Sequence, residues 1–118
     1  MLRAVRGATS VAEDSSEAIR GGTAELLGEV LARNALAADD LVSIIFTATE
    51  DLTADFPAAA AREIGLSAVP LLCTREIPVV GALGMCIRVL VHCYAPAGRA
   101  MRHVYLHEAR QLRMDLPE

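Results

Sequence analysis

The segment MCIRVLVHCY, residues 85–94, is apolar except for Arg88 and His92. An apolar run of this length, rich in Val, Ile and Leu, is typical of a strand in the interior of a sheet. Burying an unpaired guanidinium costs a large amount of free energy, so Arg88 must meet an anion. That anion is either a protein carboxylate such as Glu76 or a negatively charged ligand, and the pattern alone favours neither.

Four further segments have the composition of strands. The second along the chain places Val42, Ile44 and Phe46 on one face and is rich in β-branched residues, which favours a mostly buried strand. The other three are short alternating or apolar runs that end at turn residues. The four segments are residues 2–6, 41–49, 68–72 and 103–106.

Two helices are expected between these strands. The long one covers residues 14–34, with Asp14 and Glu17 as its capping pair. The short one covers residues 58–64 and begins after Pro57. The order of strands and helices predicts an α/β (α+β) fold in a single domain, residues 1–118.

The composition excludes several classes of function. A net charge of -4 without a basic tract argues against a nucleic-acid partner. We expect no membrane association and a cytoplasmic protein, because neither a signal peptide nor an apolar run of about 20 residues is present. The cysteines Cys73, Cys86 and Cys93 lack C-x-x-C spacing, which favours reduced thiols over a disulfide or a metal site. No cofactor motif is recognisable.

Two further arginines are candidates for a ligand site. Arg6 shares strand parity with Leu2 and Ala4, so its side chain is predicted to point to the buried side at the end of a strand, where ligand sites collect. An exposed arginine is the alternative interpretation. Arg62 follows four alanines, whose small face suits close packing against another chain, although a solvated surface is the simpler interpretation.

Several segments, taken in order, resemble the monofunctional trimeric chorismate mutases. The likeness extends from residue 1 to about residue 115, and it depends on five motifs with matching order and spacing. These are RAVRGAT at 3–9, ATEDL at 48–52, DFPA at 55–58, CIRV at 86–89 and RHVYL at 102–106.

The resemblance implies a five-stranded mixed sheet with one long and one short helix. Three copies would form a trimeric pseudo-α/β-barrel with active sites between neighbouring subunits. The implied reaction is the non-covalent Claisen rearrangement of chorismate to prephenate, without cofactor or metal.

The site residues implied by the resemblance fall into two groups. The catalytic group is Arg88, which would donate to the ether oxygen, Glu76, which would accept from the ring hydroxyl, and Arg6, which would hold a carboxylate. Phe56, Ala58, Ala59 and Arg62 would come from the neighbouring subunit. The full substrate-binding group is Tyr105, Cys73, Phe56, Ala58, Ala59, Arg62, Thr74 and Leu112.

The chain departs from the family pattern at three positions. Ala59 stands where a Lys is common, Leu72 where a Thr is common, and Pro78 where an acidic residue is common. Two other interpretations remain open from the sequence. One is a YjgF/Rid-like imine deaminase, and the other is a non-catalytic trimeric module that binds small carboxylates.

Overall fold

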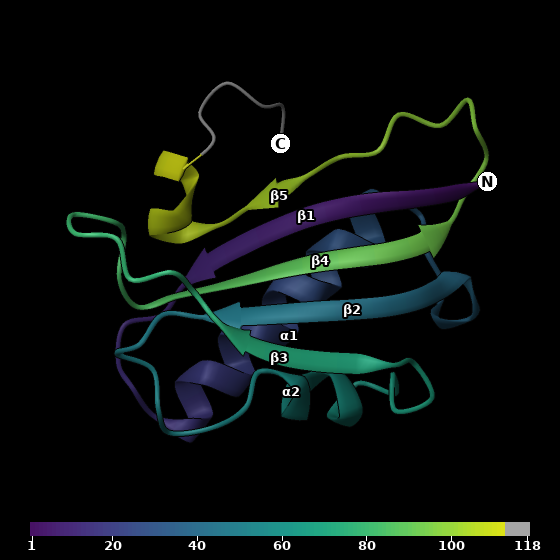
Figure 1. The fold of residues 1–118 in the computed structure, drawn as a ribbon. Helices are drawn as coiled ribbons and strands as arrows, with labels where there is room; N and C mark the ends of the chain where they lie inside the picture. The colour runs from purple at the N-terminus through teal and green to yellow at the C-terminus, as the bar shows by residue number, and fades with distance from the viewer. Residues whose placement is uncertain (113–118) are drawn as a thin grey trace.

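The computed structural model describes residues 1–112, and residues 113–118 of the expected domain lie outside the described part. Five strands form one sheet in the order β3-β2-β4-β1-β5 (Figure 1). β4 (Cys86–Tyr94) lies at its centre, as the apolar segment predicted. The other elements are β1 (Leu2–Ser10), α1 (Ser16–Arg33), the 3-10 turn η1 (Ala38–Asp40), β2 (Leu41–Ala48), α2 (Ala58–Glu63), β3 (Leu71–Arg75), β5 (Val104–Tyr105) and the 3-10 turn η2 (His107–Leu112).

The sheet contains both parallel and antiparallel pairs. β4 runs antiparallel to both of its neighbours, β1 and β2. The outer strands β3 and β5 run parallel to β2 and β1, respectively. The expected five-stranded mixed sheet with one long and one short helix is therefore confirmed.

Both α-helices pack on the same face of the sheet, behind it in the view of Figure 1. The core between them includes Val5 of β1, Phe46 of β2 and Val91 of β4, all fully buried against α1 residues such as Leu26 and Val30. No α-helix of the described residues covers the opposite face. None of these helices has the length and apolar character needed to cross a membrane.

The strand boundaries differ from the expected ones for identifiable reasons. β1 does not end before Gly7 but continues to Ser10, because it pairs with β4 along its whole length. β3 begins at Leu71 rather than at residue 68, since Pro70 has no N–H to donate to the ladder. β5 is limited to Val104–Tyr105, within the expected 103–106.

The start of the long helix is also different from the prediction. Ser15 is the N-cap of α1, and its hydroxyl accepts a 3.1 Å hydrogen bond from the Ala18 N–H. Asp14 instead accepts hydrogen bonds from Thr53 and Ala54, which ties the start of the helix to the loop after β2. The capping pair expected at Asp14 and Glu17 was therefore wrong.

Gly7 provides a test of the packing between β1 and α1. A Cβ at this position would lie 3.1 Å from side-chain carbons of Leu26 and Val89 and 3.3 Å from Val30. We expect Gly7→Ala to lower the free energy of unfolding by about 1–3 kcal/mol, because the methyl group overpacks a filled interface. Urea unfolding at fixed protein concentration measures this change.

Gly28→Ala is the matched control. Gly28 lies in α1 and has no atom within 4 Å of its would-be Cβ, so the same methyl group should stabilise the helix by ~0.5–1 kcal/mol. Equal effects of the two substitutions would contradict the close approach of β1 to α1.

Candidate functional site

A cavity of about 370 Å³ opens on the face of the sheet that no α-helix of residues 1–112 covers. Strand register creates it, because Arg88 of β4 lies opposite Ala8 of β1 on one side and Thr47 of β2 on the other. The cavity thus combines apolar side chains with two arginines and one glutamate. Its lining residues are Arg6, Ile45, Thr47, Glu76, Arg88, Val89, Leu90, Tyr105 and Leu112.

Arg88 and Glu76 form an ion pair inside this cavity. Arg88 Nε lies 3.5 Å from Glu76 Oε2, and the Thr47 hydroxyl donates a hydrogen bond to the same oxygen. The Glu76 N–H donates to the Ala48 carbonyl, which fixes the glutamate at the end of β3. Arg88 therefore meets a protein carboxylate, the first of its two expected anions.

The ion pair leaves the Arg88 guanidinium incompletely satisfied. Its Nε is buried and has no hydrogen-bond acceptor among the described residues, while 39% of the side chain remains exposed. A buried N–H without an acceptor is costly, so this atom favours an added acceptor. The arrangement is suited to a ligand that carries negative charge or a hydrogen-bonding oxygen.

The loop after β2 holds the start of β4. The Asp51 carboxylate accepts the Met85 N–H at 3.0 and 3.1 Å and the Thr49 hydroxyl at 2.5 Å. The Thr49 hydroxyl oxygen in turn accepts the Cys86 N–H at 3.0 Å. Met85 has a φ of 51°, a conformation that non-glycine residues adopt at a cost. Asp51 and Thr49 therefore fix the backbone three and two residues before Arg88, respectively.

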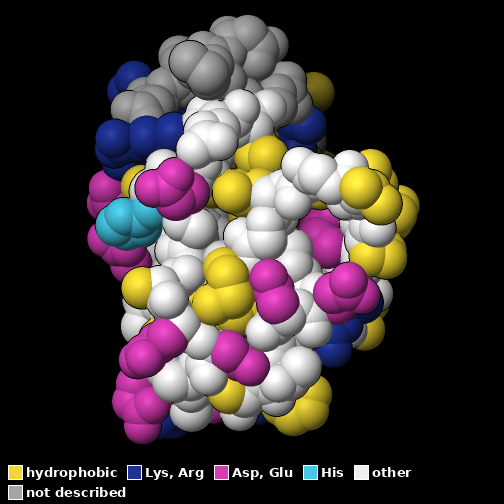
Figure 2. Space-filling view, turned by 90° about the vertical axis from the view of Figure 1, so that its left-hand side faces the viewer, with side chains coloured by type: hydrophobic (Ala, Val, Ile, Leu, Met, Phe, Trp, Pro, Cys, Tyr) yellow, Lys and Arg dark blue, Asp and Glu magenta, His cyan; other side chains and the backbone are white. Residues whose placement is uncertain are grey.

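A second cavity of about 270 Å³ adjoins the first, and Arg88 and Glu76 line both. Its outer wall is the loop that follows Glu76, where Ile77, Val79 and Val80 are 78%, 63% and 99% exposed. Hydrophobic and acidic side chains lie beside one another on this end of the molecule (Figure 2). The Arg88–Glu76 ion pair thus lies between the two cavities and lines both.

The substrate-binding residues expected from a neighbouring subunit lie elsewhere in the chain. Phe56, Ala58, Arg62 and Cys73 line a separate cavity of about 360 Å³ between α2 and the edge strand β3. Phe56 is 67% exposed at this edge. One chain therefore brings together Arg6, Glu76, Arg88, Tyr105 and Leu112 in one place and Phe56, Ala58, Arg62 and Cys73 in another.

Three of the expected residues need a more specific placement. Cys73 was expected beside Arg88, but its side chain lies on the helix-covered side of β3, near Phe56. Thr74 lines a further cavity next to Phe56 and Cys73. Ala59 is half-buried and does not line the cavity of its neighbour Ala58.

Arg6 corrects a prediction about orientation. Arg6, Leu2 and Ala4 do share one face of β1, but all three are exposed, whereas Val5 points into the core. The parity was right and the assignment of the buried side was wrong, because the helices cover the other face. Arg6 nevertheless lines the cavity with Arg88.

The cysteines that lie deepest are unsuited to act as nucleophiles. Burial raises the pKa of the Cys86 thiol, despite the opposing charge of Arg88. Burial also raises the pKa of the Cys93 thiol. Both side chains therefore stay protonated near neutral pH, and the thiolate is the reactive form.

Thr47 and Asp51 were missed as functional candidates. Their partners Glu76 and Met85 are 29 and 34 residues away in the sequence, so no local spacing connects them. A weak signal did exist for Thr47, which is a polar residue near the carboxyl end of an apolar strand. That end of a strand is where ligand sites concentrate in α/β folds.

Comparison with known proteins gives one consistent result. The chorismate mutase type I family matches residues 2–116. A chorismate mutase AroH from Thermus thermophilus is 51% identical over 98% of this chain and 97% of its own length. The corresponding protein from Bacillus subtilis is 41% identical over 98% of this chain and 93% of its own length.

The fold gives the same answer. The structure of a chorismate mutase from Clostridium thermocellum superposes with a TM-score of 0.89 at 44% identity, covering 92% of this chain and 98% of that one. None of these matches supports an imine deaminase or a non-catalytic carboxylate-binding module.

Asp51→Ala tests the anchoring of β4. Two hydrogen-bond donors lose their acceptor, so we expect a loss of about 1–3 kcal/mol in the free energy of unfolding. Hydrogen exchange at the Met85 amide should also become faster. Glu50→Ala is the control, because Glu50 is exposed and should change stability by less than ~0.5 kcal/mol. Unchanged exchange at Met85 would show that Asp51 does not hold this segment.

Proposed function

Because the chain belongs to the chorismate mutase type I family, we propose that the cavity around Arg88 and Glu76 is the catalytic half of its active site. The chain is an isomerase that converts chorismate to prephenate, in the shikimate route to phenylalanine and tyrosine. The observation that carries the placement is the buried Arg88 Nε, which lacks an acceptor among residues 1–112 and belongs to a cavity-lining side chain.

The chemistry of the reaction suits such a site. The ether C–O bond of chorismate breaks while a C–C bond forms in the same molecule, and neither proton transfer nor a covalent intermediate is required. An enzyme accelerates this reaction by holding the compact conformer and by placing donors where charge develops. No metal and no cofactor take part in this mechanism.

Arg88 is the donor to the ether oxygen in this proposal. Glu76, itself held by the Thr47 hydroxyl, positions the guanidinium before substrate arrives, so little reorganisation is needed in the transition state. A half-buried guanidinium next to apolar Leu90 acts in a lower effective dielectric than water, which strengthens its interaction with developing negative charge.

The remaining groups of this cavity bind and orient chorismate. Glu76 Oε2 is occupied by Thr47 and Arg88, whereas Oε1 has no donor among the described residues and can accept the ring hydroxyl. Arg6 and the buried Tyr105 hold a carboxylate, for which the planar guanidinium is well shaped. Leu112 supplies an apolar contact at the mouth.

The second half of the site comes from another copy of the chain in this proposal. Phe56, Ala58 and Arg62 lie at the β3 edge, apart from the Arg88 cavity of the same chain. A heterologous contact between copies would bring the two halves together, and such contacts form a ring when the rotation between copies closes. We therefore propose a homotrimer with three sites between subunits.

Ala59, Cys73 and Thr74 complete the proposed interface. They lie on α2 and β3, the elements that carry the Phe56-side residues of the second half, and this supports assigning them to the contact between copies. Cys73 contributes packing and backbone contacts rather than a thiolate. All three cysteines are free thiols, and we assign the enzyme to the reducing cytoplasm.

Replacing Arg88 by citrulline tests its role, because this change removes the charge and keeps the shape. We expect kcat to fall about 10²–10³-fold with a smaller change in KM, as for the loss of one preorganised donor. Arg88→Lys should restore only part of the rate, since a point charge on a flexible stem does not reproduce the directed donors. The loss of chorismate absorbance gives the rate.

A citrulline enzyme with normal kcat per folded protein but a lowered melting temperature would contradict the catalytic role. It would show that Arg88 serves only in a structural ion pair.

The divided site predicts complementation between inactive chains. Arg88→Ala and Arg62→Ala variants should each have low kcat/KM. When they are unfolded together and refolded as mixed trimers, about a quarter of the sites combine the wild-type Arg88 of one subunit with the wild-type Arg62 of the next. Activity above either variant alone is expected, and light scattering should return the mass of three chains. No gain in activity would refute the shared site.

A further inference from the structure

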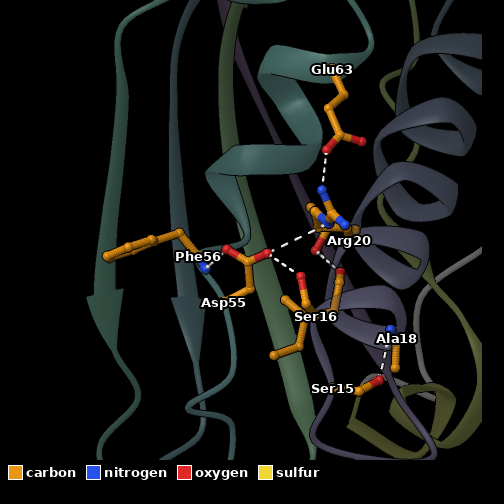
Figure 3. Close-up of polar contacts among 9 residues, drawn as sticks. Ser15, Ser16, Ala18, Arg20, Asp55, Phe56 and Glu63 are labelled. Atoms are coloured by element: carbon orange, nitrogen blue, oxygen red, sulfur yellow. Dashed lines mark hydrogen bonds and ion pairs between the residues drawn. The ribbon is translucent and has the colours of Figure 1, made fainter.

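A polar network joins the start of α1 to the segment before α2 and to the last residue of α2 (Figure 3). Arg20 of α1 lies between two carboxylates, with Nε 3.5 Å from Asp55 and a terminal nitrogen 2.6 Å from Glu63. The Ser16 hydroxyl and the Phe56 N–H also donate to Asp55, at 2.5 and 2.7 Å. Figure 3 shows the Phe56 side chain directed away from this network.

Arg62 differs from Arg20, because it forms no ion pair with a carboxylate of residues 1–112. The Arg62 side chain is exposed, and among residues 1–112 its guanidinium makes no hydrogen bond and no ion pair. Asp55 lies two residues before Pro57, the N-cap of α2, and Arg62 lies near the end of that helix. The pKa of Asp55 is lowered mainly by the Ser16 hydroxyl and the Phe56 N–H, and the charges of Arg20 and Arg62 lower it further.

Asp55 is therefore an ionised carboxylate within electrostatic reach of Arg62. Without a cation beside it, the Asp55 carboxylate would attract the Arg62 guanidinium and would compete with an anionic ligand for that guanidinium. Arg20 reduces that competition, because its positive charge already neutralises the charge of Asp55. It also engages Glu63, the residue beside Arg62, at 2.6 Å.

We propose that Arg20 is a positioning residue that occupies the carboxylates of Asp55 and Glu63 and so keeps the Arg62 guanidinium available to a carboxylate of the substrate. This inference rests on the proposed role of Arg62 at the shared site. It assigns to α1, which does not line the Arg88 cavity, an effect on substrate capture but not on the chemical step.

The test separates KM from kcat in the full-length enzyme. In Arg20→Gln the two carboxylates lose their cation, and we expect KM for chorismate to rise about 3–5-fold, the upper part of the range for a competing exposed ion pair. The value of kcat should stay within about twofold, because the Arg88 side of the site is unchanged. Arg33→Gln is the matched control, since Arg33 on the same helix pairs with Glu29 at 2.8 Å and should leave KM unaltered.

A double variant distinguishes this role from simple support of the fold. Arg20→Gln combined with Asp55→Asn removes the neutralising guanidinium and also the carboxylate charge that competes most for Arg62. KM should therefore return to within about twofold of wild type. A structural role predicts the contrary, because the double variant lacks the same contacts as Arg20→Gln and should be at least as poor. A normal KM in Arg20→Gln, or no recovery in the double variant, overturns the inference.

Arg62→Gln tells failure of the inference from failure of the proposed function. A raised KM in Arg62→Gln together with a normal KM in Arg20→Gln overturns only the role of Arg20. A normal KM in Arg62→Gln removes Arg62 from the substrate site and overturns both.

Discussion

Both α-helices pack on one face of the sheet, and this one-sided burial is the constraint on which the site depends. The covered face takes the residues that must be dry, such as Phe46 and Val91. The other face can carry Arg6, Glu76 and Arg88, because charged groups that keep partial contact with water cost much less free energy than fully buried ones. The candidate site thus lies on the face of the sheet opposite to the hydrophobic core.

The Arg88 and Glu76 pair has an energetic logic of its own. In a fully buried pair, the free energy of removing both charges from water often exceeds the attraction between them. Here the pair is partly exposed, and Arg88 Nε has no hydrogen-bond acceptor among residues 1–112, so it can still take an acceptor from a ligand. Chorismate and a second copy of the chain would both exclude water from it. The proposed interaction of Arg88 with the ether oxygen would then strengthen at the stage where it lowers the barrier.

The sequence predicted elements better than it predicted orientation. The apolar run 85–94 was sufficient to identify the central strand, and β-branched content identified β2. Parity placed Arg6 with Leu2 and Ala4 but could not tell which face the helices would cover, because that depends on how the whole chain packs. The contacts of Thr47 and Asp51 are set by strand register across the sheet, which no local pattern encodes. The family resemblance supplied the site residues that pattern alone left undecided.

Ala59 gives the availability of Arg62 particular weight. The family often has a Lys at this position, and its absence leaves Arg62 as the only cation that the α2 segment, residues 58–63, can offer to a dianion. A single exposed guanidinium can form an ion pair with a neighbouring carboxylate instead of with the substrate. Asp55 and Glu63 are two such carboxylates. The free energy needed to bring Arg20 of α1 beside these carboxylates is small, since all three side chains keep contact with solvent. Under the proposed role of Arg20, substrate capture would therefore depend on which arginine pairs with which carboxylate, and not on the number of cations alone.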